Sequence, residues 1–126
     1  MRILLDTHVL LWYLEGDERL TRSHRDLILD ARNEILVSVA SLWEIAIKTS
    51  IGKLAITRSM TEIFTQLQAQ SIDILQIEPG HILQVASLPF LHRDPFDRMI
   101  VAQAKVEFLS MITSDPEFPP YGVKTL

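Results

Sequence analysis

Cysteine is absent from this chain of 126 residues. Its absence excludes a disulfide framework, a thiolate zinc site and a cysteine nucleophile, and it suits a reducing compartment. Long apolar runs are also missing. An acid follows the apolar run Ile3-Leu4-Leu5 near the start, and no later run approaches the length of a membrane span. We therefore expect a cytoplasmic protein that is neither exported nor embedded in a membrane.

Positive charge is scarce in this chain. Its 12 Lys and Arg residues are outnumbered by 16 Asp and Glu residues, and the net charge is -4. A protein that holds nucleic acid mainly through bulk electrostatics needs an excess of cations, so the composition argues against that mode. An acidic protein can still cut nucleic acid if metal ions reverse the local charge and a basic patch contacts phosphate. The densest basic stretch has the spacing of a solvated helix face and comprises Arg19, Arg22, His24, Arg25 and Arg32.

Apolar residues make up 48% of the chain, which is enough for one well-buried core in a single domain spanning residues 1–126. Segments with strand character alternate with segments of helical spacing. The predicted strands are 3–5, 34–38, 72–77 and 111–113, with room for a short fifth strand at 123–125. The predicted helices are 8–15, 24–31, 41–51, 59–70, 81–88 and 95–108. This alternation predicts an α/β fold, a three-layer α/β/α sandwich around a central, mainly parallel sheet of four to five strands.

Two acidic residues have structural explanations at the starts of predicted helices. Asp6 follows the first strand and precedes a helix, as an N-cap does. Glu44 lies three residues after Ser41, which is the spacing of a capping box. Taken alone, each residue is explained by the helix that it begins.

Two further acids have explanations of the same kind. Asp97 follows Asp94 and Pro95, so Asp94 would cap the helix, Pro95 would be its first residue and Asp97 a favourable first-turn charge. Asp115 follows the strand 111–113 and precedes a proline, which suits a turn.

These separate explanations leave the joint placement of the four acids unexplained. Two of them follow the carboxyl ends of predicted strands, and two fall in first turns of helices that begin just after such ends. Ligand sites in open α/β sheets form beyond the carboxyl ends of the strands, so we expect the four side chains to converge there. Clustered carboxylates repel one another unless a cation neutralises them, and an all-oxygen ligand set favours Mg²⁺ or Mn²⁺. Such a site suits phosphodiester hydrolysis.

Several polar neighbours are candidates for supporting or substrate-contact roles. Arg98 and Lys48 are placed to touch a phosphate, although Lys48 is equally well placed for a surface pair with Glu44. Hydroxyls that would orient a carboxylate or a water belong to Thr7, Thr113 and Ser114. The four histidines lack zinc-ligand spacing and are interpreted as surface or cap residues. Core or dimer packing is preferred over base stacking for Trp12, Tyr13 and Trp43.

Three short blocks carry a family resemblance: Leu5-Asp6-Thr7-His8, the stretch Ser38-Val39-Ala40-Ser41-Leu42-Trp43-Glu44-Ile45, and His92-Arg93-Asp94-Pro95-Phe96-Asp97-Arg98. Together they resemble PIN-domain proteins, specifically VapC-like toxins, and the resemblance runs along nearly the whole chain. It implies a PIN-like fold and a Mg²⁺- or Mn²⁺-dependent endoribonuclease. It also implies the role of toxin in a type II toxin–antitoxin system, with RNA as substrate, a small antitoxin that blocks the site, and commonly a homodimer.

The same resemblance assigns metal-binding and catalytic roles, by motif position, to Asp6, Glu44, Asp97 and Asp115. Asp94 is a further acid of the motif, for which capping is preferred and a metal role is the minority interpretation. The family's hydroxyl beside the last acid corresponds best to Thr113. Two alternatives remain: a metal-dependent phosphatase-like enzyme, and a PIN-like RNA-binding or interaction module that does not cut. The intact set of acids disfavours the second.

Overall fold

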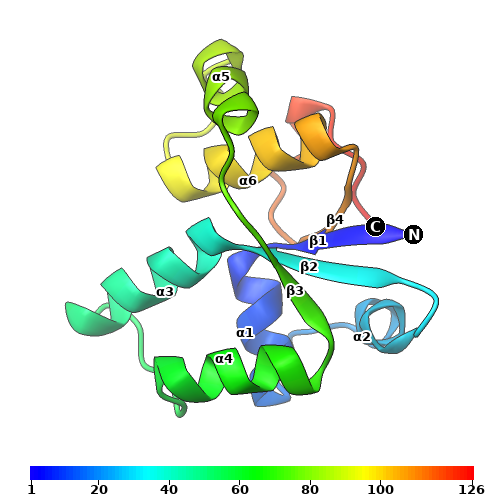
Figure 1. Cartoon of the computed structure of the whole chain (residues 1–126), viewed down its shortest axis with the longest axis vertical. Coiled ribbons are helices and arrows are strands. Elements are labelled where there is room, and N and C mark those ends of the chain that lie inside the picture. The colour runs from blue at the N-terminus through cyan, green and yellow to red at the C-terminus, as the bar shows by residue number, and fades with distance from the viewer.

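The computed structural model describes residues 1–126 and contains one parallel sheet of four strands (Figure 1). Its strands lie in the order β3-β2-β1-β4, and every neighbouring pair is parallel. Their bounds are β1 (Arg2–Leu5), β2 (Glu34–Ser38), β3 (Ile72–Leu75) and β4 (Ser110–Ile112). The four predicted strands are therefore confirmed, and all four carboxyl ends point to the same edge.

The fifth strand expected at 123–125 does not form. Only an isolated parallel bridge joins Thr125 to Met111. Directly before it, the short 3₁₀ helix η1 (Pro119–Tyr121) ends at Gly122, which has a left-handed φ of 83°. Met111 donates to the Lys124 carbonyl at 2.8 Å and accepts from the Leu126 N–H at 2.9 Å, so the pairing with β4 is limited to one residue.

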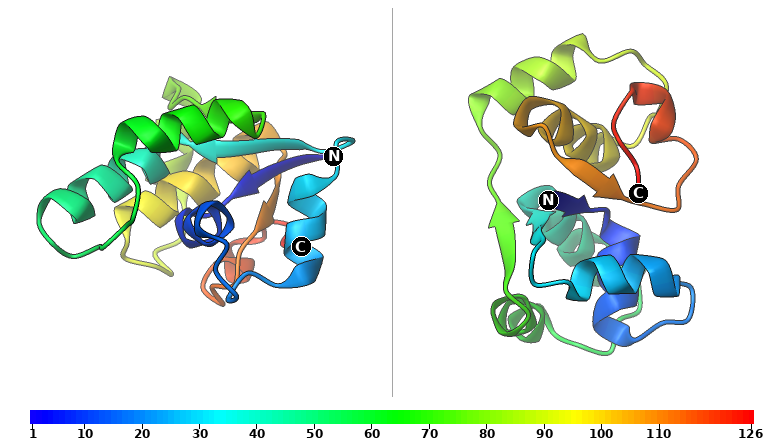
Figure 2. Two further views of the ribbon diagram at one scale, coloured as in Figure 1. Left: turned by 90° about the horizontal axis from the view of Figure 1, so that it is seen from below. Right: turned by 90° about the vertical axis from the view of Figure 1, so that its right-hand side faces the viewer.

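Six α-helices connect and cover the strands. They are α1 (Thr7–Glu15), α2 (Arg22–Leu29), α3 (Val39–Ser50), α4 (Met60–Ala69), α5 (Pro79–Ser87) and α6 (Pro95–Glu107). The three-layer sandwich is seen from two further sides in Figure 2, with α5 and α6 on one face of the sheet and the other helices mainly on the opposite face. Each predicted helix is present, with its ends shifted by a few residues.

Side chains along each strand alternate between the two faces of the sheet, so the hydrophobic core consists of two clusters, one on each face. Ile3 and Leu5 of β1 pack into the larger cluster with α1 to α4, whereas Leu4 packs with α6 on the other face. Neighbouring side chains of a strand point to opposite faces, and a parallel sheet covered on both sides needs apolar residues at every position. This is why the predicted strands appear in the sequence as short continuous apolar runs. No helix combines the length and the apolar character needed to cross a membrane.

Candidate active site

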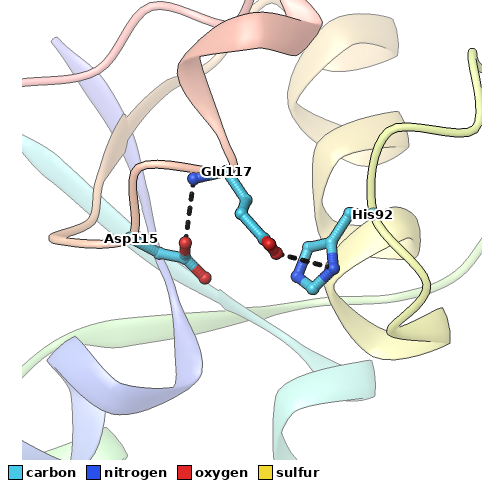
Figure 3. A group of neighbouring side chains, drawn as sticks. All are labelled: His92, Asp115 and Glu117. Carbon is cyan, nitrogen blue, oxygen red and sulfur yellow. Dashed lines mark hydrogen bonds and ion pairs between the residues drawn. The ribbon is translucent and has the colours of Figure 1, made fainter.

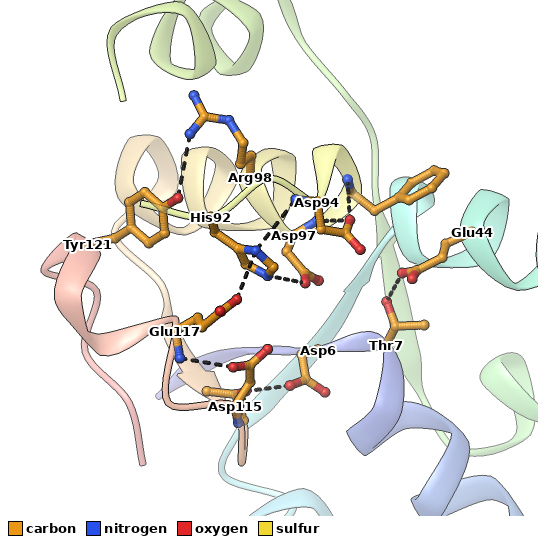
Figure 4. Close-up of polar contacts among 12 residues, drawn as sticks. Asp6, Thr7, Glu44, His92, Asp94, Asp97, Arg98, Asp115, Glu117 and Tyr121 are labelled. Carbon is orange, nitrogen blue, oxygen red and sulfur yellow. Dashed lines mark hydrogen bonds and ion pairs between the residues drawn. The ribbon is translucent and has the colours of Figure 1, made fainter. Parts of the chain in front are cut away.

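The four acids singled out by sequence point toward one another beyond the carboxyl edge of the sheet (Figure 4). Asp6 directly follows β1 and Asp115 follows β4, whereas Glu44 lies on α3 and Asp97 in the first turn of α6. Helices that return from such an edge begin near it, so all four carboxylates are brought to the same place. Their roles as ligands stay a prediction, because geometry alone does not identify what they bind.

Asp6 is held by contacts from two directions. One carboxylate oxygen accepts a hydrogen bond from the backbone N–H of Val9 at 2.8 Å, which is the predicted N-cap contact of α1, and the other accepts one from the Thr113 hydroxyl. Only 3% of Asp6 is exposed. Burial raises the pKa of Asp6, the hydrogen bonds from Thr113 and Val9 act against that increase, and the charge of Asp115 adds to it. A cap and a candidate ligand are thus the same side chain.

Glu44 does not form the capping box expected with Ser41. Strand β2 runs straight into α3, so the N-cap is Ser38, whose hydroxyl accepts from the Ala40 N–H at 3.0 Å. Glu44 lies in the second turn of the helix and is 3% exposed. The earlier helix start therefore places this carboxylate deeper in the structure than the sequence indicated.

Two side chains hold the Glu44 carboxylate. The Thr7 hydroxyl donates to its Oε1 at 2.8 Å, and the Lys48 ammonium donates to its Oε2 at 2.5 Å. This ion pair was one of the two predicted roles for Lys48, although it is half-buried rather than on the open surface. The hydrogen bond from Lys48 to Glu44 raises the pKa of the ammonium. Lys48 therefore supplies positive charge beside the acids.

Asp97 carries the largest shift among the acids. Asp94 caps α6 as predicted, because its Oδ1 accepts from the backbone N–H groups of Phe96 at 2.8 Å and of Asp97 at 3.1 Å. The pKa of Asp97 is raised to about 7, mainly by burial and further by the charges of Asp94 and Glu44, and a hydrogen bond with His92 opposes the change. Burial, together with the neighbouring negative charges, therefore moves the pKa of this carboxyl group into the neutral range.

His92 and Glu117 are site residues that the sequence did not single out. The two nitrogens of the His92 ring lie 2.8 Å from Asp97 Oδ2 and 2.8 Å from Glu117 Oε2. Each of His92, Asp115 and Glu117 offers a ligand atom within 4.8 Å of the others (Figure 3). The signal in the sequence for this pair of acids is the spacing of Asp115 and Glu117. They share a turn in which Asp115 Oδ1 accepts a hydrogen bond from the Glu117 N–H at 2.9 Å, and both acids lie close to His92.

The interpretation of the histidines as surface or cap residues therefore needs correction. His92 is half-buried within the site, and His81 is completely buried. His81 does act as a cap, because its Nδ1 accepts from the Glu78 N–H at 2.9 Å at the start of α5. Its Nε2 lies 2.9 Å from Glu107 of α6.

Arg98 does not contact the acids. Its guanidinium donates to the backbone carbonyls of Pro89 at 3.0 Å and Val85 at 3.3 Å, and it lies 4.9 Å from the centre of the Phe90 ring. The residue next to Asp97 in a helix points to another face, so adjacency in sequence did not give proximity to the carboxylates. Through these contacts, Arg98 links α6 to α5 and to the loop that follows α5.

The remaining predicted residues lie beside the acids. Thr7 and Thr113 donate to Glu44 and Asp6, as the orienting role required. Ser114 is exposed and helps to line a hollow of about 260 Å³. This hollow is lined by Asp6, His8, Trp12, Ser114 and Asp115.

The raised pKa of Asp97 predicts a pH-dependent gain in stability on Asp97→Asn. The unfolded chain ionises this group near 3.8, whereas the folded protein does so near 7, so the folded state binds more protons between these values and wild-type stability falls as pH rises. Asparagine has no proton to lose. In excess EDTA, we expect the variant to melt about 5 °C higher than wild type at about pH 8, the equivalent of about 1 kcal/mol in a chain of this size, and nearly equally at about pH 4. An equal difference at both pH values would contradict the origin given for the shift.

Comparison with known families and structures supports a common fold. The family model for the PIN domain matches residues 3–124. Comparison with curated protein sequences gives no match. Among solved structures, the chain is similar to a chain of VapBC2 from Rickettsia felis bound to a promoter DNA fragment, with 15% identity, a TM-score of 0.74 and coverage of 100% of this chain and 98% of the other.

Two other complexes contain similar chains. The match to FitAcB from Neisseria gonorrhoeae has 21% identity and a TM-score of 0.67, and it covers 98% of this chain and 96% of the other. The match to a toxin–antitoxin complex from Klebsiella pneumoniae has 19% identity and a TM-score of 0.56, and it covers 90% of this chain and 86% of the other. At these identities the structures show the fold, and the family model spans nearly all of the sequence, so the chain belongs to the PIN-domain family.

Proposed function

We propose that this chain is a Mg²⁺- or Mn²⁺-dependent endoribonuclease that acts as the toxin of a type II toxin–antitoxin system. One observation carries the proposal: acids from four separate segments point toward one another at the carboxyl edge of the sheet (Figure 4). PIN domains are generally nucleases, and the complexes with similar chains include one described as toxin–antitoxin. The choice of RNA and the role of toxin come from the family resemblance.

The residues present fit a divalent metal ion. Carboxylate oxygens dominate the candidate donor set, and cysteine is absent, which favours a hard cation such as Mg²⁺ or Mn²⁺. The pKa of Asp97 is raised to about 7 in the presence of the neighbouring acids, and a cation would relieve that repulsion. The candidate ligands are Asp6, Glu44, Asp97 and Asp115, with His92 and Glu117 in addition.

In phosphodiester hydrolysis, a bound metal ion and the protein side chains would have separate roles. A bound Mg²⁺ or Mn²⁺ ion lowers the pKa of a water and stabilises charge on the phosphoryl oxygens. Thr113 and Thr7 fix the orientation of Asp6 and Glu44 through their hydrogen bonds, and caps at the starts of α1 and α6 fix the backbone that carries Asp6 and Asp97. Lys48, beside Glu44, is the cation placed to face a phosphate.

Removal of the Thr113 hydroxyl should weaken metal binding without removing a ligand. In Thr113→Val, Asp6 loses the hydrogen bond that opposes its raised pKa, so a proton competes more strongly with the metal. We expect affinity for Mn²⁺, measured by calorimetry, to fall about 10- to 100-fold. Thr113→Ser is the matched control, since it keeps the hydroxyl and should bind nearly as well as wild type. Equal affinity of all three proteins would remove Thr113 from the site.

Cleavage of total RNA, with the cut positions mapped, tests the proposed function most directly. We expect cutting with Mg²⁺ or Mn²⁺, none with EDTA, and recovery when the metal is returned in excess. Hydrolysis of small phosphomonoesters without RNA cleavage would instead identify a phosphatase-like enzyme. Saturable RNA binding without cleavage, at every metal tested, would identify a module that does not cut.

The toxin role also requires a partner. We infer a small antitoxin, and an apolar hollow of about 270 Å³ beside the acids is a surface suited to it. The hollow lies between α3, α5 and α6 and is lined mainly by apolar side chains, among them Trp43, which is 59% exposed, and Phe96. The rings of Trp43 and Phe96 meet edge to face with 5.3 Å between their centres, and the hollow lies between the helices that carry Glu44 and Asp97.

A small reading frame adjacent to the gene is the expected source of this antitoxin. Its product, expressed together with this chain, should form a complex in which RNA cleavage stops. A gene standing alone would count against the toxin role and leave the nuclease proposal intact. We further expect a homodimer, for which sedimentation of the purified chain is the test.

A further inference from the structure

One hollow beside the acids has a lining that the hydrolytic reaction does not explain. Asp6 and Asp115 form its inner wall, and His8, Trp12 and Ser114 form the rest of its lining. Its volume of about 260 Å³ lies just below the range of about 300–1,000 Å³ typical of pockets for drug-sized molecules, so it has room for about one flat ring system. It lies beside α1, the helix that carries His8 and Trp12.

Aromatic rings line the outer side of this hollow. His8 and Trp12 lie one turn apart on α1, with ring centres 6.2 Å apart and planes tilted by 46°. His8 is exposed and Trp12 is half-buried. As expected from its helical spacing and apolar neighbours, Trp12 packs against the larger core cluster, but it also lines the hollow. Core packing is therefore only part of what Trp12 does.

A positively charged side chain, Arg19, lies next to Trp12. The Arg19 guanidinium lies 5.2 Å from the centre of a Trp12 ring, and its Nε and Nη2 donate to Asp17. Its side chain is 69% exposed, and Nη1 points to no partner within the chain. Starting at Asp6 and Asp115, the surface thus presents acids, then an aromatic wall, then an exposed guanidinium.

We propose that this hollow is a nucleobase subsite, in which one unpaired base of a single-stranded RNA stacks on Trp12, with His8 at the edge of the base, next to the scissile phosphate. Single-strand binding commonly combines aromatic stacking platforms with positive charge along the backbone. The Ser114 hydroxyl faces the base edge, and Arg19 contacts the following phosphate. This inference rests on the proposed function, because it names a part of the substrate of that same site.

Fluorescence of Trp12 tests the subsite without requiring cleavage. The chain has only two tryptophans, so Trp43→Phe leaves Trp12 as the single reporter. In this variant carrying also Asp97→Asn and held in Mg²⁺, we expect oligouridylate and oligoadenylate to quench the emission saturably. In a series of oligomers, each with one abasic site at a different position, we expect only one position of that site to abolish the quenching. Uniform loss at all positions, or no quenching, would overturn the stacking assignment.

Binding and kinetics of two α1 variants give the second test. Trp12→Ala should weaken oligomer binding about 5- to 150-fold, the range that stacking on an aromatic ring contributes. In the cleaving protein it should raise KM while kcat changes little. Trp12→Phe keeps an aromatic ring for stacking and should retain most of the affinity. His8→Ala removes an exposed side chain, so its effect on binding does not come from a loss of core packing. Phe108→Ala, at a residue that is 93% exposed on another part of the chain, is the matched control and should change neither value.

The outcomes separate this inference from the proposed function. Wild-type cleavage with unchanged KM in both Trp12→Ala and His8→Ala would overturn the subsite and leave the nuclease intact. Position-specific quenching in a protein that cuts no RNA would support the subsite and refute the nuclease. Absence of both cleavage and quenching would overturn both proposals.

Discussion

If the proposed function is right, Asp97→Asn and Glu44→Gln should each reduce RNA cleavage by at least about 10²- to 10³-fold, the scale of removing one group that stabilises developing charge in a site of this kind. Each change replaces a carboxylate by an amide of nearly the same shape. The hydrogen bonds from the α6 backbone to the Asp94 cap and from the Thr7 hydroxyl to Glu44 need no charge on the altered residues, so we expect the fold to be kept. The loss should fall mainly on kcat measured at saturating Mn²⁺.

A matched control separates this effect from a general loss of negative charge. Asp73 is an exposed acid on β3 of the same sheet, and Asp73→Asn should cut RNA at the wild-type rate. Circular dichroism and thermal melting of each variant check the fold. Cleavage by Asp97→Asn as fast as wild type would mean that the site has been assigned to the wrong residues.

The same assay distinguishes the predicted acids from those that only the structure brought forward. Asp115 and Glu117 lie on one turn and both face His92 (Figure 3). If Asp115 is the ligand and Glu117 only orients His92, Asp115→Asn should lower kcat far more than Glu117→Gln. The reverse ranking would move the metal toward the histidine and correct the family assignment.

The sequence predicted the elements of the fold because each strand is buried on both faces. Short apolar runs such as Ile35-Leu36-Val37 stand out between helical segments, and their alternation with helices implies parallel pairing. The start of α3 was missed because β2 passes directly into the helix. Val39 and Ala40 fit either element, so no turn residue marks the boundary.

The sequence predicted those features of the candidate site that depend on residues close together in the chain. Capping by Asp6 and Asp94 depends on residues two or three positions away, and both caps are confirmed. The contacts of His92 depend on a turn far along the chain, which carries Glu117. Burial of His92 and its contact with Glu117 are tertiary properties, and no spacing in one sequence encodes them.

The turn that carries Asp115 and Glu117 is anchored to the core by Phe118. This side chain is 1% exposed, packs in the cluster that includes Leu88 and Tyr121, and meets the edge of the His92 ring at 6.5 Å between centres. Phe118 therefore links the stability of the smaller core to the geometry of the candidate site.

Phe118→Ala should cost about 3–5 kcal/mol in the free energy of unfolding, the typical effect of emptying a buried phenylalanine position. That is a large share of the about 5–15 kcal/mol that stabilises a domain, so we expect a marked decrease in the midpoint of urea unfolding. Phe108→Ala is the control for the same chemical change at a residue that is 93% exposed, and its effect should stay within about 0.5 kcal/mol. Equal midpoints for the two variants would show that Phe118 does not anchor the core.

The same variant connects folding to the site, because a ligand that binds only the folded state stabilises it. Mn²⁺ at about 100 times its dissociation constant adds about 2.7 kcal/mol to the stability of a protein with one site. We expect wild type and Phe108→Ala to gain equally from a given Mn²⁺ concentration. Phe118→Ala should gain less, since the turn that presents Asp115 is no longer fixed. A full gain in Phe118→Ala would mean that the metal is held without that turn, and would restrict the ligands to Asp6, Glu44 and Asp97.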